Sequence, residues 1–371
     1  MNHFCTYFDR HFLVQGMAMA ASLRQHDPTS VLWVLSLDAY TTDFLREVKD
    51  ERINLVELSE IEVADPSLLA AKSKRSSVEY YFTLSPCWPR YLLLEYTEID
   101  RITYVDADMF FFASPAPIFS EMGAASVLIT EHRYPSHLSH HERCGRFNVG
   151  LLSFRNDSVG RACLDNWRNN CLAWCHDRAE DGKYADQKYL DEWPELLGKT
   201  LHISRRRGAN LAPWNWSQYR YTFAGGKVWV HSDPLEVFHF ARFRPSLGSR
   251  WFQSGQLEYG IMPWRLRQHI YGRYWSALER ALGSIRRHRP KHLISRSTIR
   301  RWHNFWRALA PRILFGSDWL RIGPFFISGR LSFGRYSGLL LSWTRRWRVG
   351  ETKPETAKPS PVLATAPIDV E

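Results

Sequence analysis

Short apolar runs alternate with segments of helical periodicity along the first part of the chain. Residues 3–8, 31–37 and 53–58 are short stretches rich in β-branched and aromatic side chains, a composition typical of buried strands. Residues 12–23 and 43–49, which lie between them, place apolar side chains at helical intervals. This alternation predicts an α/β fold with a mostly parallel central sheet and helices on both faces.

A pair of carboxylates follows the next predicted strand. Residues 102–105 form another strand of the buried type after a helical segment at 90–96, and Asp106 and Asp108 follow that strand. Open α/β sheets bind ligands at the carboxyl ends of their strands, and two carboxylates one residue apart can share a divalent ion that holds a diphosphate. The plain alternative is a solvated turn, because Asp is a common turn residue.

Strand and helix patterns continue beyond the carboxylates. Residues 125–130 and 146–154 predict two more strands, and residues 159–175 and 184–190 predict two more helices. Asn148 lies in the second of these strands beside a glycine, which often marks the close approach of a ligand or of other backbone. A side-chain amide suits sugar hydroxyl groups, although a structural bulge explains the same residues equally well.

Three further segments carry candidate binding residues. Residues 132–144 hold four histidines in a polar loop, for which a mobile substrate lid is a better interpretation than a zinc site because the spacing is irregular. Residues 210–216 contain two tryptophans that could stack on a sugar or pack in the core. His239 lies in the alternating run 235–245, where a lone histidine is typically a core residue.

Basic charge is concentrated at the end of the chain. The net charge is +11, yet residues 1–260 carry 28 Lys and Arg against 32 Asp and Glu, whereas residues 261–371 carry 21 against 6. We therefore predict a catalytic domain over 1–260, a basic and mainly helical region over 261–349, and a disordered tail over 350–371.

Residues 290–315 show the pattern of a cationic amphipathic helix. Isoleucine, leucine and tryptophan recur at spacings of three and four, with arginines beside them. Such a helix either packs on the catalytic domain or lies on an anionic membrane surface, and the excess of basic residues favours the membrane.

Other sequence signals narrow the class of protein. The six cysteines form neither Cys-x-x-Cys pairs nor a dense disulfide framework, no secretory leader is evident, and no apolar run is long enough to span a membrane. These features predict a cytoplasmic protein, peripheral to the inner membrane face if residues 290–315 bind there. There is no glycine-rich dinucleotide fingerprint and no P-loop, so a bound phosphate would depend on a metal ion.

Five segments together resemble the nucleotide-sugar glycosyltransferases of the GT-A fold, and within them glycosyltransferase family 8 and its bacterial relatives. They are Phe-Cys-Thr-Tyr at 4–7, Tyr-Val-Asp-Ala-Asp at 104–108, Phe-Asn-Val-Gly at 147–150, Asp-Gln at 186–187 and His-Phe at 239–240. The segments fall in the order of that family and at similar intervals across residues 1 to about 250, two thirds of the chain. The resemblance implies a GT-A catalytic domain.

The resemblance also implies roles for individual residues. Asp106, Asp108 and His239 would bind Mn²⁺ or Mg²⁺, a set of oxygens with one imidazole that suits Mn²⁺. The implied nucleotide-binding residues are Cys5, Thr6, Tyr7, Arg90, Asp106 and Arg244, and those implied at the transferred sugar and reacting carbon are Asn148, Asp186 and Gln187. The sequence departs from the family at 241–245, where a glycine is missing and arginine replaces lysine.

The expected activity follows from this resemblance. It is metal-dependent transfer of a sugar from a nucleotide-diphospho-sugar, expected to be a UDP-sugar, to a saccharide or lipid-linked acceptor in cell-surface polysaccharide or glycolipid synthesis. Retention of configuration is expected, with Gln187 under the sugar ring, while Asp186 as a nucleophile or as an inverting base is the alternative. The rival hypotheses are a non-catalytic nucleic-acid-binding protein that acts through the basic tail, and a nucleotidyltransferase of the same fold. No nucleic acid is expected as a partner, and the glycine-rich loop of the nucleotidyltransferases is missing.

Overall fold

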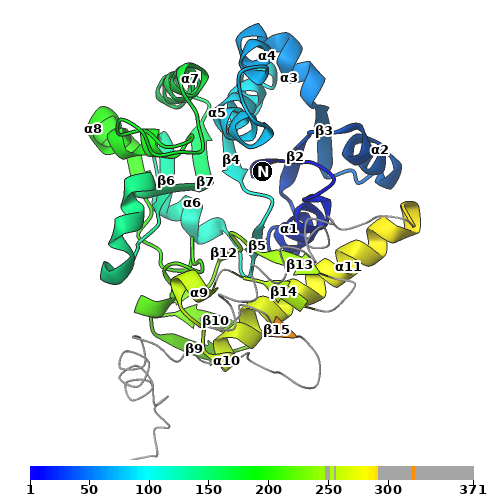
Figure 1. Ribbon diagram of the computed structural model, residues 1–371, viewed down its shortest axis with the longest axis vertical. Helices are drawn as coiled ribbons and strands as arrows, with labels where there is room; N and C mark the ends of the chain where they lie inside the picture. The colour runs from blue at the N-terminus through cyan, green and yellow to red at the C-terminus, as the bar shows by residue number, and fades with distance from the viewer. Residues whose placement is uncertain (247–250, 255, 291–319, 322–371) are drawn as a thin grey trace, which may run out of the picture.

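A seven-stranded sheet forms the centre of the molecule (Figure 1). The computed structural model describes residues 1–246, 251–254, 256–290 and 320–321. The strand order is β3-β2-β1-β4-β7-β6-β8, and β7 alone runs antiparallel to its neighbours in this sheet. The strands are β1 (His3–Phe8), β2 (Val31–Ser36), β3 (Ile53–Glu57), β4 (Arg101–Val105), β6 (Val127–Glu131), β7 (Phe147–Arg155) and β8 (Leu201–Ile203).

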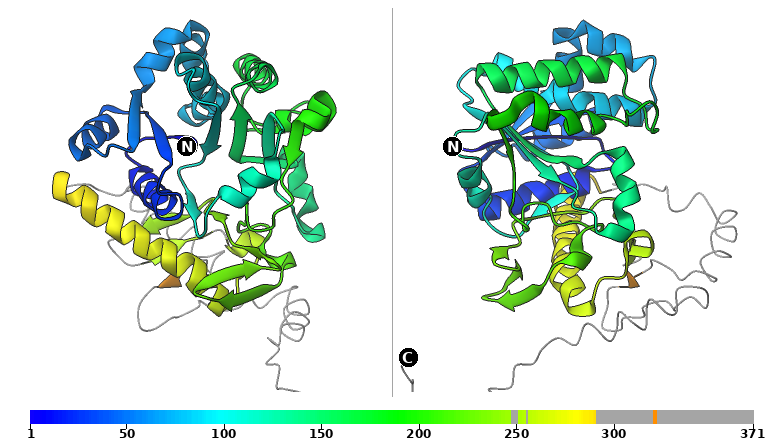
Figure 2. Two further views of the ribbon diagram at one scale, coloured as in Figure 1. Left: turned by 180° about the vertical axis from the view of Figure 1, so that it is seen from behind. Right: turned by 90° about the vertical axis from the view of Figure 1, so that its left-hand side faces the viewer.

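Helices cover both faces of this sheet (Figure 2). On one face, α5 and α7 pack together over a core that contains Trp88 and Trp167, and on the other face α1 packs against α11. The helices of the first face are α3 (Leu58–Ala64), α4 (Pro66–Lys72), α5 (Ser77–Glu95), α7 (Ser158–Ala173) and α8 (Trp193–Leu197). Those of the second face are α1 (Leu13–His26), α2 (Ala39–Val48), α6 (Ala116–Met122) and α11 (Arg273–His288). The predicted α/β fold with a mostly parallel sheet between helices is confirmed.

Two predicted helices differ from the observed ones. The helix before β4 is 19 residues long, because a capping box of Ser76 and Glu79 starts it well upstream and it continues through Pro86 and Pro89. The prolines hid this helix from the sequence pattern. The helix predicted at 184–190 is instead a short 3₁₀ helix, η2 (Lys188–Glu192), which leads into α8.

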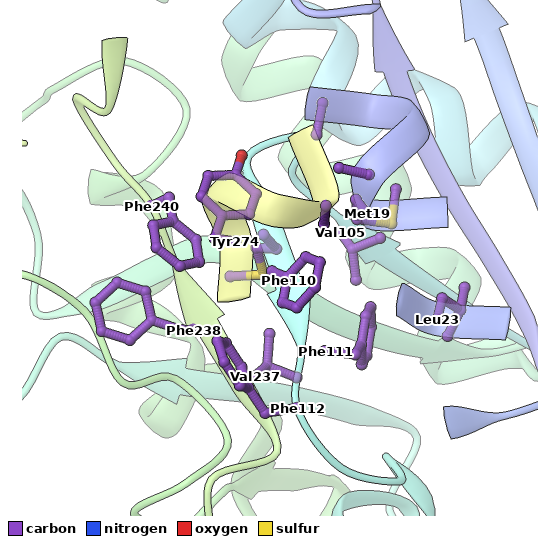
Figure 3. Packing of buried hydrophobic residues seen from close by; sticks show 14 of the residues in the cluster. Met19, Leu23, Val105, Phe110, Phe111, Phe112, Val237, Phe238, Phe240 and Tyr274 are labelled. Atoms are coloured by element: carbon purple, nitrogen blue, oxygen red, sulfur yellow. The ribbon is translucent and has the colours of Figure 1, made fainter. Parts of the chain in front are cut away.

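Smaller strands surround the second face of the main sheet. Strand β5 (Met109–Phe111) pairs antiparallel with β12 (Val237–His239), and Phe110 and Phe238 from this pair pack in the core (Figure 3). The remaining strands form two small antiparallel sheets. These strands are β9 (Tyr221–Ala224), β10 (Lys227–Val230), β11 (Asp233–Pro234), β13 (Arg244–Ser246), β14 (Trp251–Gln253) and β15 (Leu320–Arg321).

Residues on both sides of the predicted boundary at 260 share one core. Helix α11 buries a stripe that includes Tyr274, Leu278 and Ile285 in the same cluster as β5 and β12. Tyr274 stacks on Phe240 with ring centroids 3.7 Å apart (Figure 3). The segment before α11 consists of α9 (Gln256–Tyr259), α10 (Trp264–Arg267) and one π-helical turn, η5 (Gln268–Gly272).

Two predictions for the basic region fall outside the described residues. The amphipathic helix predicted at 290–315 lies there except for its first residue, and so does the tail predicted at 350–371. Within the described part of the chain, no helix combines the length and the apolar character needed to cross a membrane.

Candidate metal centre and active site

The two carboxylates lie where the central strand β4 ends. The backbone N–H of Asp106 donates to the carbonyl of Gly150 on β7, 3.0 Å away, which holds Asp106 beside the first residues of β7. The N–H of Met109 then donates to the carbonyl of Asp106, also at 3.0 Å, so the chain turns sharply between β4 and β5. The turn that the sequence left as the alternative is thus present, and it presents both carboxylates at one edge of the sheet.

Pairing of β5 with β12 brings His239 to this turn. His239 lies opposite Met109 in the antiparallel register, and the N–H of Phe240 donates to the carbonyl of Asp108 at 2.9 Å. The Nε2 atom of His239 is 3.2 Å from Oδ1 of Asp108 and 3.5 Å from Oδ2 of Asp106. One candidate ligand atom from each residue lies within 4.8 Å of the others. The three predicted metal ligands therefore converge in the structure.

Electrostatics at this cluster suit a cation. Burial raises the pKa of Asp106, the imidazole of His239 opposes that rise, and the like charge of Asp108 adds to it. Burial by itself disfavours the imidazolium of His239, but the two aspartates outweigh it and its pKa is raised. Two partly exposed carboxylates and one buried imidazole that converge on one point form a donor set that fits Mn²⁺ or Mg²⁺.

Asn148 fixes the orientation of the His239 ring. Its Oδ1 accepts from the N–H of Gly150 at 3.1 Å, so the amide oxygen points toward His239, whose Nδ1 is also 3.1 Å away. An oxygen there requires the proton on Nδ1 of His239 and leaves the lone pair of Nε2 directed at the carboxylates. This is the tautomer that a metal ligand needs.

A second histidine holds the other end of the same amide. The Nδ2 group of Asn148 donates to Nε2 of His132 at 3.2 Å, and Nδ1 of His132 faces the carbonyl of Arg146 at 3.3 Å. Burial lowers the pKa of His132 to about 3, so this ring is neutral and remains an acceptor for Asn148. The backbone carbonyl of His132 accepts hydrogen bonds from Nε1 of Trp214 and Nδ2 of Asn215, each at 2.9 Å.

His132 is a site residue that the sequence interpretation missed. The sequence pattern groups it with the polar histidine loop, yet it is buried and belongs to the network behind the candidate metal ligands. The remainder of that loop forms a 3₁₀ helix, η1 (Ser136–Cys144). The sequence signal that could have identified His132 is its position two residues after the predicted strand 125–130, because that strand ends at the same edge of the sheet as β4.

Gly150 makes room for His239. A Cβ atom at this position would lie 2.8 Å from Cε1 of His239 and 2.5 Å from Cε of Met109. Both distances are shorter than real contacts of a Cβ atom. The close approach that a glycine inside a strand predicts is present here, and the approaching group is the candidate metal ligand.

Asp186 and Tyr7 lie beside the metal centre. Burial raises the pKa of Asp186 to about 7, a hydrogen bond from Ser85 opposes this shift, and the charge of Asp106 adds to it. The hydroxyl of Tyr7 is 3.0 Å from that of Ser85, and the charges of Asp106 and Asp186 contribute, after burial, to a raised pKa of Tyr7. The structure thus gathers Tyr7, Asp186 and the metal cluster at the carboxyl ends of β1 and β4.

Gln187 is held beside the glycine that follows η1. Its Nε2 donates to the carbonyl of Cys144 at 2.9 Å, and a Cβ atom on Gly145 would lie 3.1 Å from its side chain. The predicted position of Gln187 under a sugar ring stays a prediction.

The other four predicted nucleotide-binding residues are Cys5, Thr6, Arg90 and Arg244. Cys5 and Thr6 are fully buried within β1. Arg90 forms an ion pair with Asp165, which joins α5 to α7. Arg244, at the start of β13, is exposed. Contacts of these residues with a nucleotide remain predictions.

No family model matches the chain. Two proteins of Bacillus subtilis (strain 168) do: "Uncharacterized protein YfnD" is 34% identical over 244 residues, 65% of this chain and 78% of YfnD, and "Uncharacterized protein YfnF" is 32% identical over 249 residues, 65% of this chain and 81% of YfnF.

Similar solved structures include three glycosyltransferases at low sequence identity. Mouse xyloside xylosyltransferase 1 is 14% identical, with 65% of this chain and 98% of that chain covered and a TM-score of 0.44. The galactosyltransferase LgtC is 14% identical, with 64% and 87% covered and a TM-score of 0.44. The glycosyltransferase GlyE of Streptococcus pneumoniae TIGR4 is 13% identical, with 76% and 64% covered and a TM-score of 0.43.

Proposed function

We propose that this chain, which belongs to the family of the Bacillus subtilis proteins YfnD and YfnF, is a metal-dependent glycosyltransferase of the GT-A type. It moves a sugar from a nucleotide-diphospho-sugar, a UDP-sugar in the first instance, to a saccharide or lipid-linked acceptor. The observation that supports this proposal is the convergence of Asp106, Asp108 and His239 at the carboxyl edge of an α/β sheet.

The chemistry required of the site is stabilisation of a leaving group. A nucleoside diphosphate gains negative charge as the glycosidic bond breaks, and a bound Mn²⁺ or Mg²⁺ supplies positive charge where that charge develops. Asp106, Asp108 and His239 hold the ion, while Asn148 keeps the His239 ring in the ligating tautomer. Tyr7, near the end of β1, is the candidate contact for the nucleotide, because β1 pairs with β4 and the charge of Asp106 acts on the Tyr7 hydroxyl.

Asp186 and Gln187 are the candidates to act at the reacting carbon. Burial raises the pKa of Asp186 to about 7 in the metal-free chain, and a carboxyl group that keeps its proton is a poor nucleophile. This favours direct attack of the acceptor hydroxyl, with retention of configuration, over a covalent intermediate on Asp186. The hydroxyl would approach on the face from which the diphosphate leaves, with Gln187 beneath the sugar. Measurement of the anomeric configuration of the product separates retention from inversion, in which Asp186 would act as a base.

We also propose a location for the enzyme in the cell. We place it in the cytoplasm, peripheral to the inner membrane face, in synthesis of cell-surface polysaccharide or glycolipid. Contact with anionic lipid would be made through residues 290–315, whose sequence carries arginine and tryptophan at amphipathic spacing.

A panel of nucleotide sugars tests the activity. Donor hydrolysis and transfer are measured with Mn²⁺ and with a chelator, for the wild type, for Asp108→Ala, and for Asp43→Ala, an exposed carboxylate on α2 that serves as the matched control. We expect turnover that requires the ion, survives Asp43→Ala and falls at least a hundredfold in Asp108→Ala. Equal turnover by Asp108→Ala, or no turnover with any donor together with no nucleotide binding, would contradict the proposal.

A further inference from the structure

An open cavity of about 670 Å³ lies where β6 and β8 end. Because these two strands run parallel to β4, the cavity is at the same edge of the sheet as the metal centre. The two sites are also neighbours in sequence, since Arg133 and Arg146 line the cavity while His132 and Asn148 form the network behind His239. The volume is in the range of small-molecule sites.

The cavity lining is strongly basic. Four arginines, Arg133, Arg146, Arg205 and Arg207, face it together with a single carboxylate, Glu131. The surrounding segment from residue 196 to residue 232 contains six lysines and arginines and no aspartate or glutamate. This contrasts with residues 1–260 as a whole, where acidic residues outnumber basic ones. This part of the chain is therefore more basic than residues 1–260 as a whole, and two of its arginines, Arg205 and Arg207, line the cavity.

One arginine is fixed as part of the wall. The guanidinium of Arg133 donates to the carbonyl of Arg206 at 2.8 Å and to the carbonyl of Ser204, and the backbone of Arg133 has a positive φ of 53°. The only lining carboxylate is already paired, since Glu131 is 2.6 Å from Arg146 and 3.8 Å from Arg133. Glu131 thus cannot neutralise the remaining arginines.

Two arginines of the lining have no counter-ion in the part of the chain that the structure describes. Arg205 and Arg207 are exposed, and among the described residues neither guanidinium has an ion pair or a hydrogen bond. Their backbone N–H groups are anchored instead, to Glu121 and Asp233, each at 2.9 Å. The chain is thus held in place while both guanidinium groups remain available to an oxyanion.

We propose that this cavity binds an oxyanion, a phosphate or a carboxylate, carried by the acceptor sugar. The inference rests on the proposed glycosyl transfer and specifies the class of acceptor. Strand β4 and its candidate metal centre lie between two parts of the sheet: β1, which carries Tyr7 as the proposed nucleotide contact, and the β6–β8 side, which holds the cavity. A donor bound at the metal centre would therefore leave the cavity to the acceptor.

Ligand-observed NMR on the full chain tests this assignment without metal or donor. The probes are glucose 6-phosphate, glucuronic acid and neutral glucose, at low and at physiological ionic strength. The proteins are the wild type, the double variant Arg205→Ala/Arg207→Ala, and the control Lys199→Ala/Arg220→Ala, which removes the same charge from exposed residues of the same segment outside the cavity.

We expect at least one charged sugar to bind the wild type more tightly than glucose, with affinity lowered tenfold or more in Arg205→Ala/Arg207→Ala and nearly unchanged in the control. The two charged probes show which oxyanion is preferred. Equal losses in both double variants, or no preference for either charged sugar over glucose, would overturn the inference. Because neither UDP nor Mn²⁺ is present, this result is independent of whether the donor panel shows turnover.

Discussion

The Oδ1 atom of Asn148 lies 3.1 Å from Nδ1 of His239, and this contact sets the chemistry of the candidate metal ligand. The N–H of Gly150 fixes which end of the amide faces the ring, so Nδ1 of His239 carries a proton and Nε2 faces the two carboxylates, where it would bind an ion. In the proposed site, Asn148 would therefore act on the metal ion through His239, whether or not it also contacts the sugar.

Replacement of Asn148 by leucine should weaken metal binding in the absence of any sugar. We expect the affinity for Mn²⁺ to fall about tenfold or more, as for other partners of ligating histidines. Electron paramagnetic resonance of free Mn²⁺ measures this directly with the apo protein. If metal affinity were unchanged and only the KM for the donor rose, Asn148 would belong to the sugar site alone.

Gly150→Ala should disturb the same ligand by crowding. The new Cβ would overlap Met109 and His239, and we expect a loss of about 1–3 kcal/mol in the free energy of unfolding together with weaker Mn²⁺ binding. Gly283→Ala on α11 is the matched control, because nothing lies within 4 Å of a Cβ there and alanine favours a helix. Urea unfolding of both variants should show a loss for the first and no loss for the second.

Asp186 should make the metal-free protein less stable as the pH rises. Its pKa is about 7 in the folded chain against an ordinary value of 3.8, so the folded state keeps a proton that the unfolded state loses. Its contribution to stability is complete below pH 3.8 and is lost as the pH rises to about 7.

Asp186→Asn should remove this loss. We expect the variant to be more stable than the wild type at pH 8 and similar to it near pH 4, while its transfer activity falls. Urea unfolding at the two pH values gives the comparison. A variant less stable than the wild type at pH 8 would show that the charge of Asp186 is favourable in the fold.

A chain ending at residue 260 should not fold on its own. Removal of α11 would expose Phe240 and Phe110, on which Tyr274 packs, along with the face of α1 that α11 covers. A chain ending at residue 290 should retain a cooperative thermal transition. Circular dichroism of the two truncated chains decides the point, and equal transitions would mean that the domain boundary predicted at 260 is a real one.

Much of the sheet could be predicted because its signals are local. The strand before Asp106 and the strand that holds Asn148 are apolar runs bounded by polar residues, and both are observed close to their predicted limits. The pairing of β5 with β12 could not be read in this way, since no local pattern specifies contacts between segments so far apart in sequence. For that reason only the family resemblance suggested His239.

Two other features, the core shared by residues on both sides of 260 and the burial of His132, were obscured by stronger signals in the sequence. The charge count drew the boundary at 260, although the spacing of Tyr274, Leu278 and Ile285 is that of a helix with one buried face. The sequence pattern groups His132 with three polar histidines, whereas its burial and its hydrogen bond to Asn148 on β7 set it apart. Both cases depend on tertiary packing, which composition does not report.

The most direct test of a metal-dependent donor site is a crystal structure of the protein soaked with UDP and Mn²⁺, with diffraction data collected at the manganese edge. We predict one anomalous peak bonded to Asp106, Asp108 and Nε2 of His239, with the diphosphate of UDP as a further ligand. Ordered UDP without such a peak, or a manganese ion bound elsewhere while these three side chains remain free, would contradict the account.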